Sequence, residues 1–263
     1  LVENHQSLYL DKVTSMINKI TLFGYHFASL DIRQDSRVHD KMFRSLVGEL
    51  IENGSELFPN NFFELSDDDQ KSHLVSIKGS VGAIEFKEEL SQDIVETIQA
   101  MKSIQETNGE IACSRYIISN NQTTMNVLQL FAMLKIVAFN EKLTADVVPL
   151  FETVTDLIAA PKVMEELYTN PHYRAHLENR NNRQTIMLGF SDGTKDGGYL
   201  MANWAIFKAK EALTTLSRKY NIDVIFFDGR GGPPARGGGK THQFYASLGP
   251  TIEDKEIQLT IQG

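Results

Sequence analysis

Two glycine-rich stretches contain side chains able to bind an anion or a metal ion. Of the 18 glycines in the chain, six lie in residues 229–239 and four in residues 189–198. Glycine lets the backbone adopt positive φ angles and approach a ligand closely. Each stretch follows a predicted strand, and in α/β sheets and barrels the carboxyl ends of the strands carry the active site. The clustering therefore predicts a ligand site at that end of a sheet.

The stretch Asp228–Lys240, DGRGGPPARGGGK, is suited to a phosphate or a carboxylate. Its backbone N–H groups are interleaved with the cations of Arg230, Arg236 and Lys240. It is not a GxxxxGK[ST] phosphate loop, because the first glycine of that motif would stand six positions before Lys240, where the chain has Pro234, and it does not match GxGxxG. The alternatives are a solvated flexible loop or an RGG-like nucleic-acid tail. The acidic chain and the ordered elements predicted on both sides disfavour them.

The stretch Gly189–Leu200, GFSDGTKDGGYL, adds carboxylates suited to a divalent cation. Asp192 comes directly after a predicted strand, and Glu152 follows another strand in the same way. Two carboxylates at one rim form the sparse site that Mg²⁺ takes when substrate and water complete its shell. The structural alternative for Glu152, and the one we favour for Asp196, is a carboxylate at a helix N-terminus.

Arg33 is a further candidate for the same pocket, because it ends the first predicted strand within the run IRQDSR. A guanidinium there would meet the negative charge of a phosphate or carboxylate ligand. The structural alternative is an ion pair with Asp31 or Asp35, which lie two residues away on either side.

Composition limits the classes of protein that this chain can represent. It has 263 residues with 26 Lys and Arg against 34 Asp and Glu, a net charge of −8 that disfavours a nucleic-acid or anionic-membrane partner. The longest strongly apolar stretch, residues 128–139, is too short to span a bilayer. Cys113 is the single cysteine, so no internal disulfide or Cys-based zinc site forms, and the cytoplasm is the expected location. The ends of the sequence lead us to expect a piece of a larger protein.

Helical and strand-like segments alternate along the chain. The predicted helices are 7–22, 36–52, a short one starting near Ser66, 87–106, 123–139, 153–169 and 195–220. The predicted strands are 26–33, 112–119, 146–151, 183–190, 223–228 and about 256–261. This alternation indicates parallel βαβ units with right-handed crossovers. The expected fold is α/β, a partial (β/α) TIM-like barrel with many helices, although Pro149 inside a strand is unusual.

The last long predicted helix also has a pronounced apolar face. We expect Trp204, Phe207 and the apolar face of residues 199–216 to lie in the core, because large apolar residues at helical spacing are usually buried.

Five segments carry a resemblance that reaches across the chain. They are LDIRQDSRVH (30–39), SRYIIS (114–119), PLFETVTDL (149–157), MLGFSDGTKDGGYLMANW (187–204) and FFDGRGGPPARGGG (226–239). In this order they resemble the phosphoenolpyruvate carboxylase family, and the closing EIQLTIQG is similar to the family's strand after the glycine loop. We expect residues 1–263 to be a single segment of the family's barrel domain. Residues 53–110 carry little of the likeness and are expected to be a variable helical insertion.

The resemblance implies a function and a set of site residues. The family's β-barrel is wrapped by many helices, its members are usually tetramers, and they add bicarbonate to phosphoenolpyruvate with Mg²⁺ or Mn²⁺, giving oxaloacetate and phosphate. The implied metal ligands are Glu152 and Asp192, the implied substrate-binding residues are Arg33, Arg230 and Arg236, and the catalytic candidates are Arg236, Arg230, Asp228 and Lys195.

The chain also departs from the family pattern. Asp228 stands where the family usually has His before GRGG, and Pro233 and Pro234 stiffen the glycine-rich stretch. Family members are several times longer, so we expect these 263 residues alone to be inactive. The alternative hypothesis is a non-catalytic homologue that binds phosphorylated metabolites or acts in assembly.

Overall fold

The computed structural model contains one parallel sheet of six strands whose spatial order follows the sequence, β1-β2-β3-β4-β5-β6. The structure describes residues 3–24, 26–82, 86–140, 142–229 and 240–260. The strands are β1 (Asp31–Asp35), β2 (Arg115–Ser119), β3 (Asp146–Phe151), β4 (Arg183–Gly189), β5 (Asp223–Gly229) and β6 (Ile257–Leu259). A parallel sheet with neighbours in chain order is the arrangement of a (β/α) barrel, which closes at eight strands. The expected α/β fold, a partial barrel, is confirmed.

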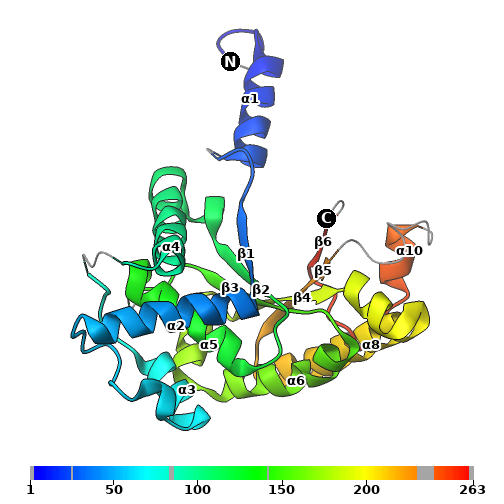
Figure 1. Ribbon diagram of the computed structural model, residues 1–263. Helices are drawn as coiled ribbons and strands as arrows, with labels where there is room; N and C mark the ends of the chain where they lie inside the picture. Colours follow the sequence, from blue (N-terminus) through cyan, green and yellow to red (C-terminus); the bar gives the residue numbers. More distant parts are fainter. Residues whose placement is uncertain (1–2, 25, 83–85, 141, 230–239, 261–263) are drawn as a thin grey trace.

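Helices connect the strands (Figure 1). They are α1 (Leu10–Phe23), α2 (Ser36–Glu52), α3 (Asp67–Ser76), α4 (Glu89–Asn108), α5 (Thr124–Leu134), α6 (Val154–Thr169), α7 (Pro171–Asn179), α8 (Ser191–Lys219) and α10 (Thr241–Ala246). Two short 3₁₀ turns, η1 (Phe62–Glu64) and η2 (Glu110–Cys113), and a π-helical turn, η3 (Lys135–Phe139), complete the connections.

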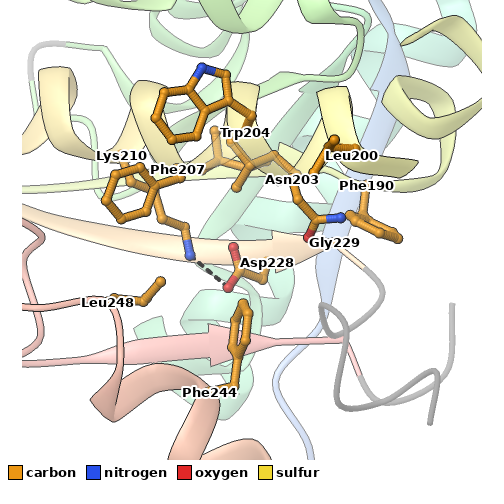
Figure 2. A pocket seen from close by; sticks show the side chains of 12 residues that line it. Phe190, Leu200, Asn203, Trp204, Phe207, Lys210, Asp228, Gly229, Phe244 and Leu248 are labelled. Atoms are coloured by element: carbon orange, nitrogen blue, oxygen red, sulfur yellow. Dashed lines mark hydrogen bonds and ion pairs between the residues drawn. The ribbon is translucent and has the colours of Figure 1, made fainter. Parts of the chain in front are cut away.

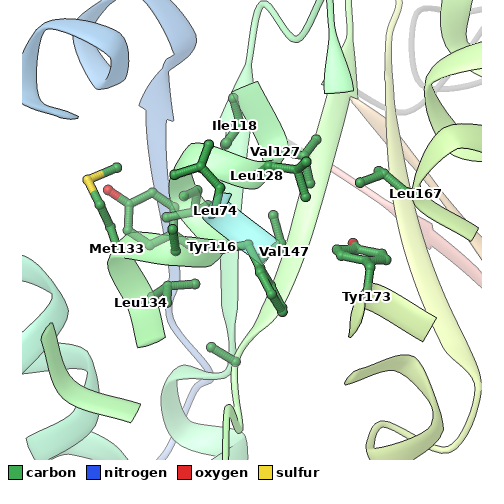
Figure 3. Packing of buried hydrophobic residues seen from close by; sticks show 14 of the residues in the cluster. Leu74, Tyr116, Ile118, Val127, Leu128, Met133, Leu134, Val147, Leu167 and Tyr173 are labelled. Atoms are coloured by element: carbon green, nitrogen blue, oxygen red, sulfur yellow. The ribbon is translucent and has the colours of Figure 1, made fainter. Parts of the chain in front are cut away.

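Alternate residues of each strand face two different environments. One face packs on the helices in the main core, which Figure 3 shows around Tyr116, Ile118 and Val147. The other face carries a smaller cluster made of strand residues alone: Ile117, Val148, Leu150 and Met187, with Phe227 against it. Since side chains alternate along a strand, the position of a residue in this two-fold pattern decides whether it faces the helices or the helix-free side.

Local capping fixes where several helices begin. The side chain of Ser66 accepts a hydrogen bond from the Asp69 N–H, as expected for a helix starting there. The cap of α2 is Asp35, whose side chain accepts from the Arg37 N–H, so Ser36 is the first helical residue. Thr153 caps α6 in a reciprocal box with Asp156.

Three expectations from the sequence are corrected. The first strand begins at Asp31, so residues 26–30 are not part of it. The helix α7 was missed, because it follows α6 with almost no linker and has Pro171 in its first turn. Trp204 is more than half exposed and not in the core, because the buried face of α8 is formed by other residues, among them Ala202, Ala205, Ala209 and Leu213.

Pro149 fits its strand because of the pairing around it. It pairs with Ile118 of β2, and β3 meets β4 only after it, at Leu150 and Phe151. The missing N–H of proline therefore removes no bond from the β3–β4 ladder.

The first helix stands apart from the body of the molecule (Figure 1). It has no buried residue, and Val13, Met16, Ile17 and Ile20 are exposed along its length. Among the described residues, no helix is both long and apolar enough to cross a membrane.

Candidate functional site

Glu152 stands at the centre of the candidate site, at the carboxyl end of β3. It follows Leu150 by two residues and so continues the helix-free face of the sheet. The Arg33 Nη2 donates a hydrogen bond to Glu152 Oε1 at 3.1 Å, and the Asn120 backbone N–H donates to Oε2 at 2.7 Å. Arg33 pairs in register with Ile117, which lies on the same face. The first three strands thus bring a cation and a carboxylate together.

Glycines of the second stretch let β4 and α8 pack directly on Glu152. A Cβ on Gly189 would lie 3.0 Å from Glu152 Cγ and 3.1 Å from its Cα, and a Cβ on Gly193 would lie 3.2 Å from the Glu152 carbonyl oxygen. Such distances are too short for a side chain without displacement of a neighbour. Two of the clustered glycines, Gly189 and Gly193, therefore allow β4 and α8 to pack closely against Glu152.

Neighbouring groups act on the pKa of Glu152 in opposite directions. Burial raises its pKa above the ordinary value, the Asn120 N–H and the Arg33 guanidinium lower it, and the negative charge of Asp192 raises it again. The net direction is upward. The contact of Gly193 with the Glu152 carbonyl oxygen places the neighbouring Asp192 on the same side of α8 as this site. A cation between the two predicted metal carboxylates would relieve their repulsion.

Asp192, Lys195 and Asp196 make separate contacts in the first turns of α8. Asp192 is half exposed, and its Oδ1 accepts a hydrogen bond from Lys195 Nζ at 2.8 Å. Asp196 accepts from the Val154 N–H at 3.1 Å, so its carboxylate stands at the N-terminus of α6, a neighbouring helix. Asp196 thus has the helix-terminus role that we favoured for it, at a helix other than its own.

Asp228 lies in a different setting, on the face of β5 that packs against the helices. It pairs in register with Leu188, a residue of the main core. Its Oδ2 accepts hydrogen bonds from Lys210 Nζ of α8 at 2.7 Å and from the Tyr245 hydroxyl of α10 at 2.6 Å. Burial, followed by the negative charge of Asp228, raises the pKa of Tyr245 and keeps its hydroxyl a donor.

An apolar cavity of about 330 Å³ adjoins this cluster. Trp204 and Phe207 of α8, Phe190 and Phe244 contribute its aromatic walls, and Asn203, Lys210 and Asp228 contribute polar groups to its lining (Figure 2). The ion pair thus joins the end of β5 to the buried face of α8.

The remaining predicted site residues, Arg230 and Arg236, lie outside the described residues, as do Pro233 and Pro234. The structure thus brings Arg33, Glu152 and Asp192 together and places Asp228 on the opposite face of the sheet.

Three contributors escaped the sequence analysis. The Asn120 N–H holds Glu152 through the backbone, which no residue type reveals. Lys210 and Tyr245 are 18 and 17 residues from Asp228 and meet it only through the packing of α8 and α10. A lysine among the small buried residues of α8 was a signal for Lys210, since buried lysines are nearly always paired.

Two carboxylates form the donor set available to a metal ion. Among the residues that the structure describes, no group of three or more His, Cys, Asp or Glu side chains is arranged to hold a metal. Glu152 and Asp192 fit Mg²⁺ or Mn²⁺, because hard oxygen ligands suit these ions and Mg²⁺ commonly binds one or two carboxylates with water and substrate.

Comparison with known proteins connects this arrangement to one family. The family model described as phosphoenolpyruvate carboxylase matches residues 1–263. Phosphoenolpyruvate carboxylases of Nitrosomonas eutropha and Synechococcus sp. are each 33% identical, over 100% and 96% of this chain and 29% and 24% of their own lengths. That of Paraburkholderia xenovorans is 32% identical over 100% of the chain and 27% of its length. The chain spans less than a third of these relatives, and it belongs to the phosphoenolpyruvate carboxylase family.

Proposed function

We propose that the full-length protein containing this chain carboxylates phosphoenolpyruvate with bicarbonate, giving oxaloacetate and phosphate. Residues 1–263 would form a single segment of its barrel domain, with residues 53–110 as a variable helical part. The observation that carries the proposal is the meeting of Arg33 and Glu152 at the carboxyl ends of the strands, with Gly193, the neighbour of Asp192, packed on the Glu152 carbonyl oxygen. The names of the relatives supply the substrate.

Glu152 and Asp192 would hold the divalent ion, either Mg²⁺ or Mn²⁺. When bound, such an ion stabilises negative charge that develops on a substrate oxygen. Glu152 is prepared for this role by the Asn120 N–H and by Arg33, which fix both of its oxygens, and by Gly189, which packs on its stem. The raised pKa of Glu152 follows first from burial, and positive charge near the carboxylate favours its ionised form.

Arg33 would orient the phosphate of the substrate. A guanidinium has five N–H donors in a planar fork, and Arg33 commits Nη2 to Glu152 while its side chain stays half exposed.

In the proposed reaction a bicarbonate oxygen attacks phosphorus and the bond from phosphorus to the enol oxygen breaks, which gives carboxyphosphate and the enolate of pyruvate. Carboxyphosphate then releases CO₂ and phosphate, and the enolate carbon attacks CO₂.

Arg230, Arg236 and Lys195 complete the proposal. Cations at the glycine-rich segment would balance negative charge on the oxygens during phosphoryl transfer. Lys195 is held by Asp192 in the first turns of α8, which places its ammonium near the metal carboxylates. A homotetrameric assembly and a cytoplasmic location stay predictions.

One observation favours the second candidate, a non-catalytic homologue that binds phosphorylated metabolites or acts in assembly. Asp228 replaces the usual histidine and is turned toward Lys210 and Tyr245, away from Glu152. A direct catalytic role for Asp228 therefore stays a prediction that activity measurements decide.

The test is phosphate release that requires both bicarbonate and phosphoenolpyruvate. We expect the full-length protein to turn over with Mg²⁺ or Mn²⁺ and the 263-residue chain alone to be inactive. Full-length protein that binds phosphoenolpyruvate without turnover would support the non-catalytic homologue. Robust turnover by the isolated chain would contradict our expectation for the fragment.

A further inference from the structure

The buried cluster of Lys210, Asp228 and Tyr245 joins three elements at one point. Lys210 comes from the middle of α8, Asp228 from the end of β5 and Tyr245 from α10. The Lys210 and Asp228 side chains are almost fully buried, and both donors converge on the same oxygen, Asp228 Oδ2. A charged pair so far from water has few alternative partners, so its geometry fixes the elements that carry it.

Asp228 is followed by the residue that links this cluster to the candidate site. Gly229 pairs in register with Gly189, and a Cβ on Gly229 would lie 3.1 Å from the Leu188 carbonyl oxygen and 3.7 Å from the Gly189 Cα. Gly189 in turn packs on the stem of Glu152. The contacts therefore run without a gap from the ion pair to the carboxylate on the other face of the sheet.

Helix α8 provides a second connection to the same site. Its first turn carries Asp192, and its middle carries Lys210. Between them Gly198 has φ of 78° and ψ of 169°, a break in the helix. Lys210 therefore anchors the regular part of α8 that follows this break. The first turns of α8 are positioned separately, by their contacts with Glu152 and Val154.

We propose that Lys210 and Tyr245 are positioning residues, which act through Asp228 to hold the end of β5 so that Gly229 and Gly189 seat Glu152 for metal binding. The proposal rests on the proposed function for the metal role of Glu152 and Asp192. In this proposal the charge of Asp228 supports the geometry of the site.

The test measures Mn²⁺ binding to the full-length protein by electron paramagnetic resonance, without substrate, together with thermal unfolding. Lys210→Met keeps the length of the side chain and leaves the Asp228 charge unpaired. We expect its Mn²⁺ affinity to fall about 10- to 100-fold, the range for loss of a group that supports a metal ligand. Lys208→Met is the matched control, because Lys208 lies on the same helix, is exposed and pairs with Glu211.

Two further variants separate positioning from simple stabilisation. Lys210→Met with Asp228→Leu removes both charges, so we expect the stability lost in Lys210→Met to return, whereas the Mn²⁺ affinity stays low because the anchor at the end of β5 is gone. Tyr245→Phe removes one hydrogen bond and should lower the affinity less than Lys210→Met does. These variants keep the proposal testable if Lys210→Met alone does not fold.

Each outcome has a defined meaning. Lys210→Met protein that melts earlier but binds Mn²⁺ like the wild type would overturn the proposal, as would a double variant that binds Mn²⁺ like the wild type. Wild-type protein that binds Mn²⁺ but does not carboxylate phosphoenolpyruvate would overturn the proposed function alone. Wild-type protein that binds no Mn²⁺ would overturn both.

Discussion

Two carboxylate–cation pairs stand at the same end of the sheet and differ in their access to water. Arg33–Glu152 lies on the helix-free face, with the side chains 50% and 14% exposed. Lys210–Asp228 lies on the helix-facing side, with the side chains 4% and 9% exposed. The open pair keeps donors available for a ligand, whereas the closed pair has its donors directed at a single oxygen. The carboxylates at the ends of β3 and β5, the two strands on either side of β4, thus differ in their access to ligand and water.

The difference follows from the alternation of side chains along the strands. Glu152 is two residues after Leu150 of the helix-free cluster, whereas Asp228 is two residues after Phe226 of the main core. A carboxylate displaced by one position along its strand faces the other side of the sheet. A carboxylate at the end of a strand therefore faces either the open side of the sheet or a buried lysine.

The largest expected effect is on the closed pair. Asp228→Leu leaves the Lys210 ammonium buried without its partner, which costs about 3–5 kcal/mol in the free energy of unfolding. Urea unfolding of the 263-residue chain, followed by far-ultraviolet circular dichroism, measures this loss. Lys208→Met, which breaks an exposed pair on the same helix, should change the midpoint little. An Asp228→Leu midpoint equal to that of the control would show that the two pairs do not differ as we describe.

The second effect concerns the glycine between the two pairs. Gly189→Ala places a Cβ within 3.0 Å of Glu152 Cγ and 3.1 Å of its Cα, and part of this contact is with backbone. We expect a loss of about 1–3 kcal/mol in unfolding free energy, the usual cost of overpacking. Gly48→Ala is the matched control: no atom lies within 4 Å of the added Cβ, and an alanine in α2 should stabilise by about 0.5–1 kcal/mol. Equal stability of the two variants would contradict the close packing.

Sequence patterns predicted where most of the strands lie, and they predicted some of the residues at the candidate site. Strand 146–151 was predicted with its observed bounds, because an apolar run between helices has few other interpretations. Gly193, the neighbour of Asp192, packs on the Glu152 carbonyl oxygen, so the segments that follow β3 and β4 meet, and the shared metal role of Glu152 and Asp192 stays a prediction.

The parts that escaped prediction depend on three-dimensional packing. The pattern of large apolar residues predicted a buried Trp204, yet α8 packs on the core through a face of alanines and leucines that excludes Trp204, so the choice of face depended on the packing of its neighbours. The contact between Lys210 and Asp228 depends on the alternation of side chains along β5 and on the position of Lys210 along α8. No rule of sequence spacing relates these two positions. The missed helix α7 shows the same limit for short segments.

The third prediction separates binding from stability at the open pair. Glu152→Gln removes one metal carboxylate, so we expect Mn²⁺ affinity and carboxylation by the full-length protein to fall at least about 10-fold. Because Arg33 is half exposed, the loss in unfolding free energy should stay below about 1 kcal/mol. Calorimetric Mn²⁺ titration and urea unfolding measure the two quantities. A large loss of stability without a change in Mn²⁺ affinity would reverse the roles that we assign to the two pairs.

The smallest expected effect is the pH dependence of the open pair. Burial raises the pKa of Glu152 above its ordinary value of 4.5, so the folded chain binds this proton more tightly than the unfolded chain does. The stability that Glu152 contributes is therefore fully present below pH 4.5 and is lost as the pH rises through the folded-state pKa. Glu152→Gln has no such proton, so the stability of the wild type relative to this variant should fall as the pH increases from about 4 to 7 without metal. Urea midpoints of both proteins across this range measure the trend, and a difference that grows with pH in favour of the wild type would contradict the burial of Glu152.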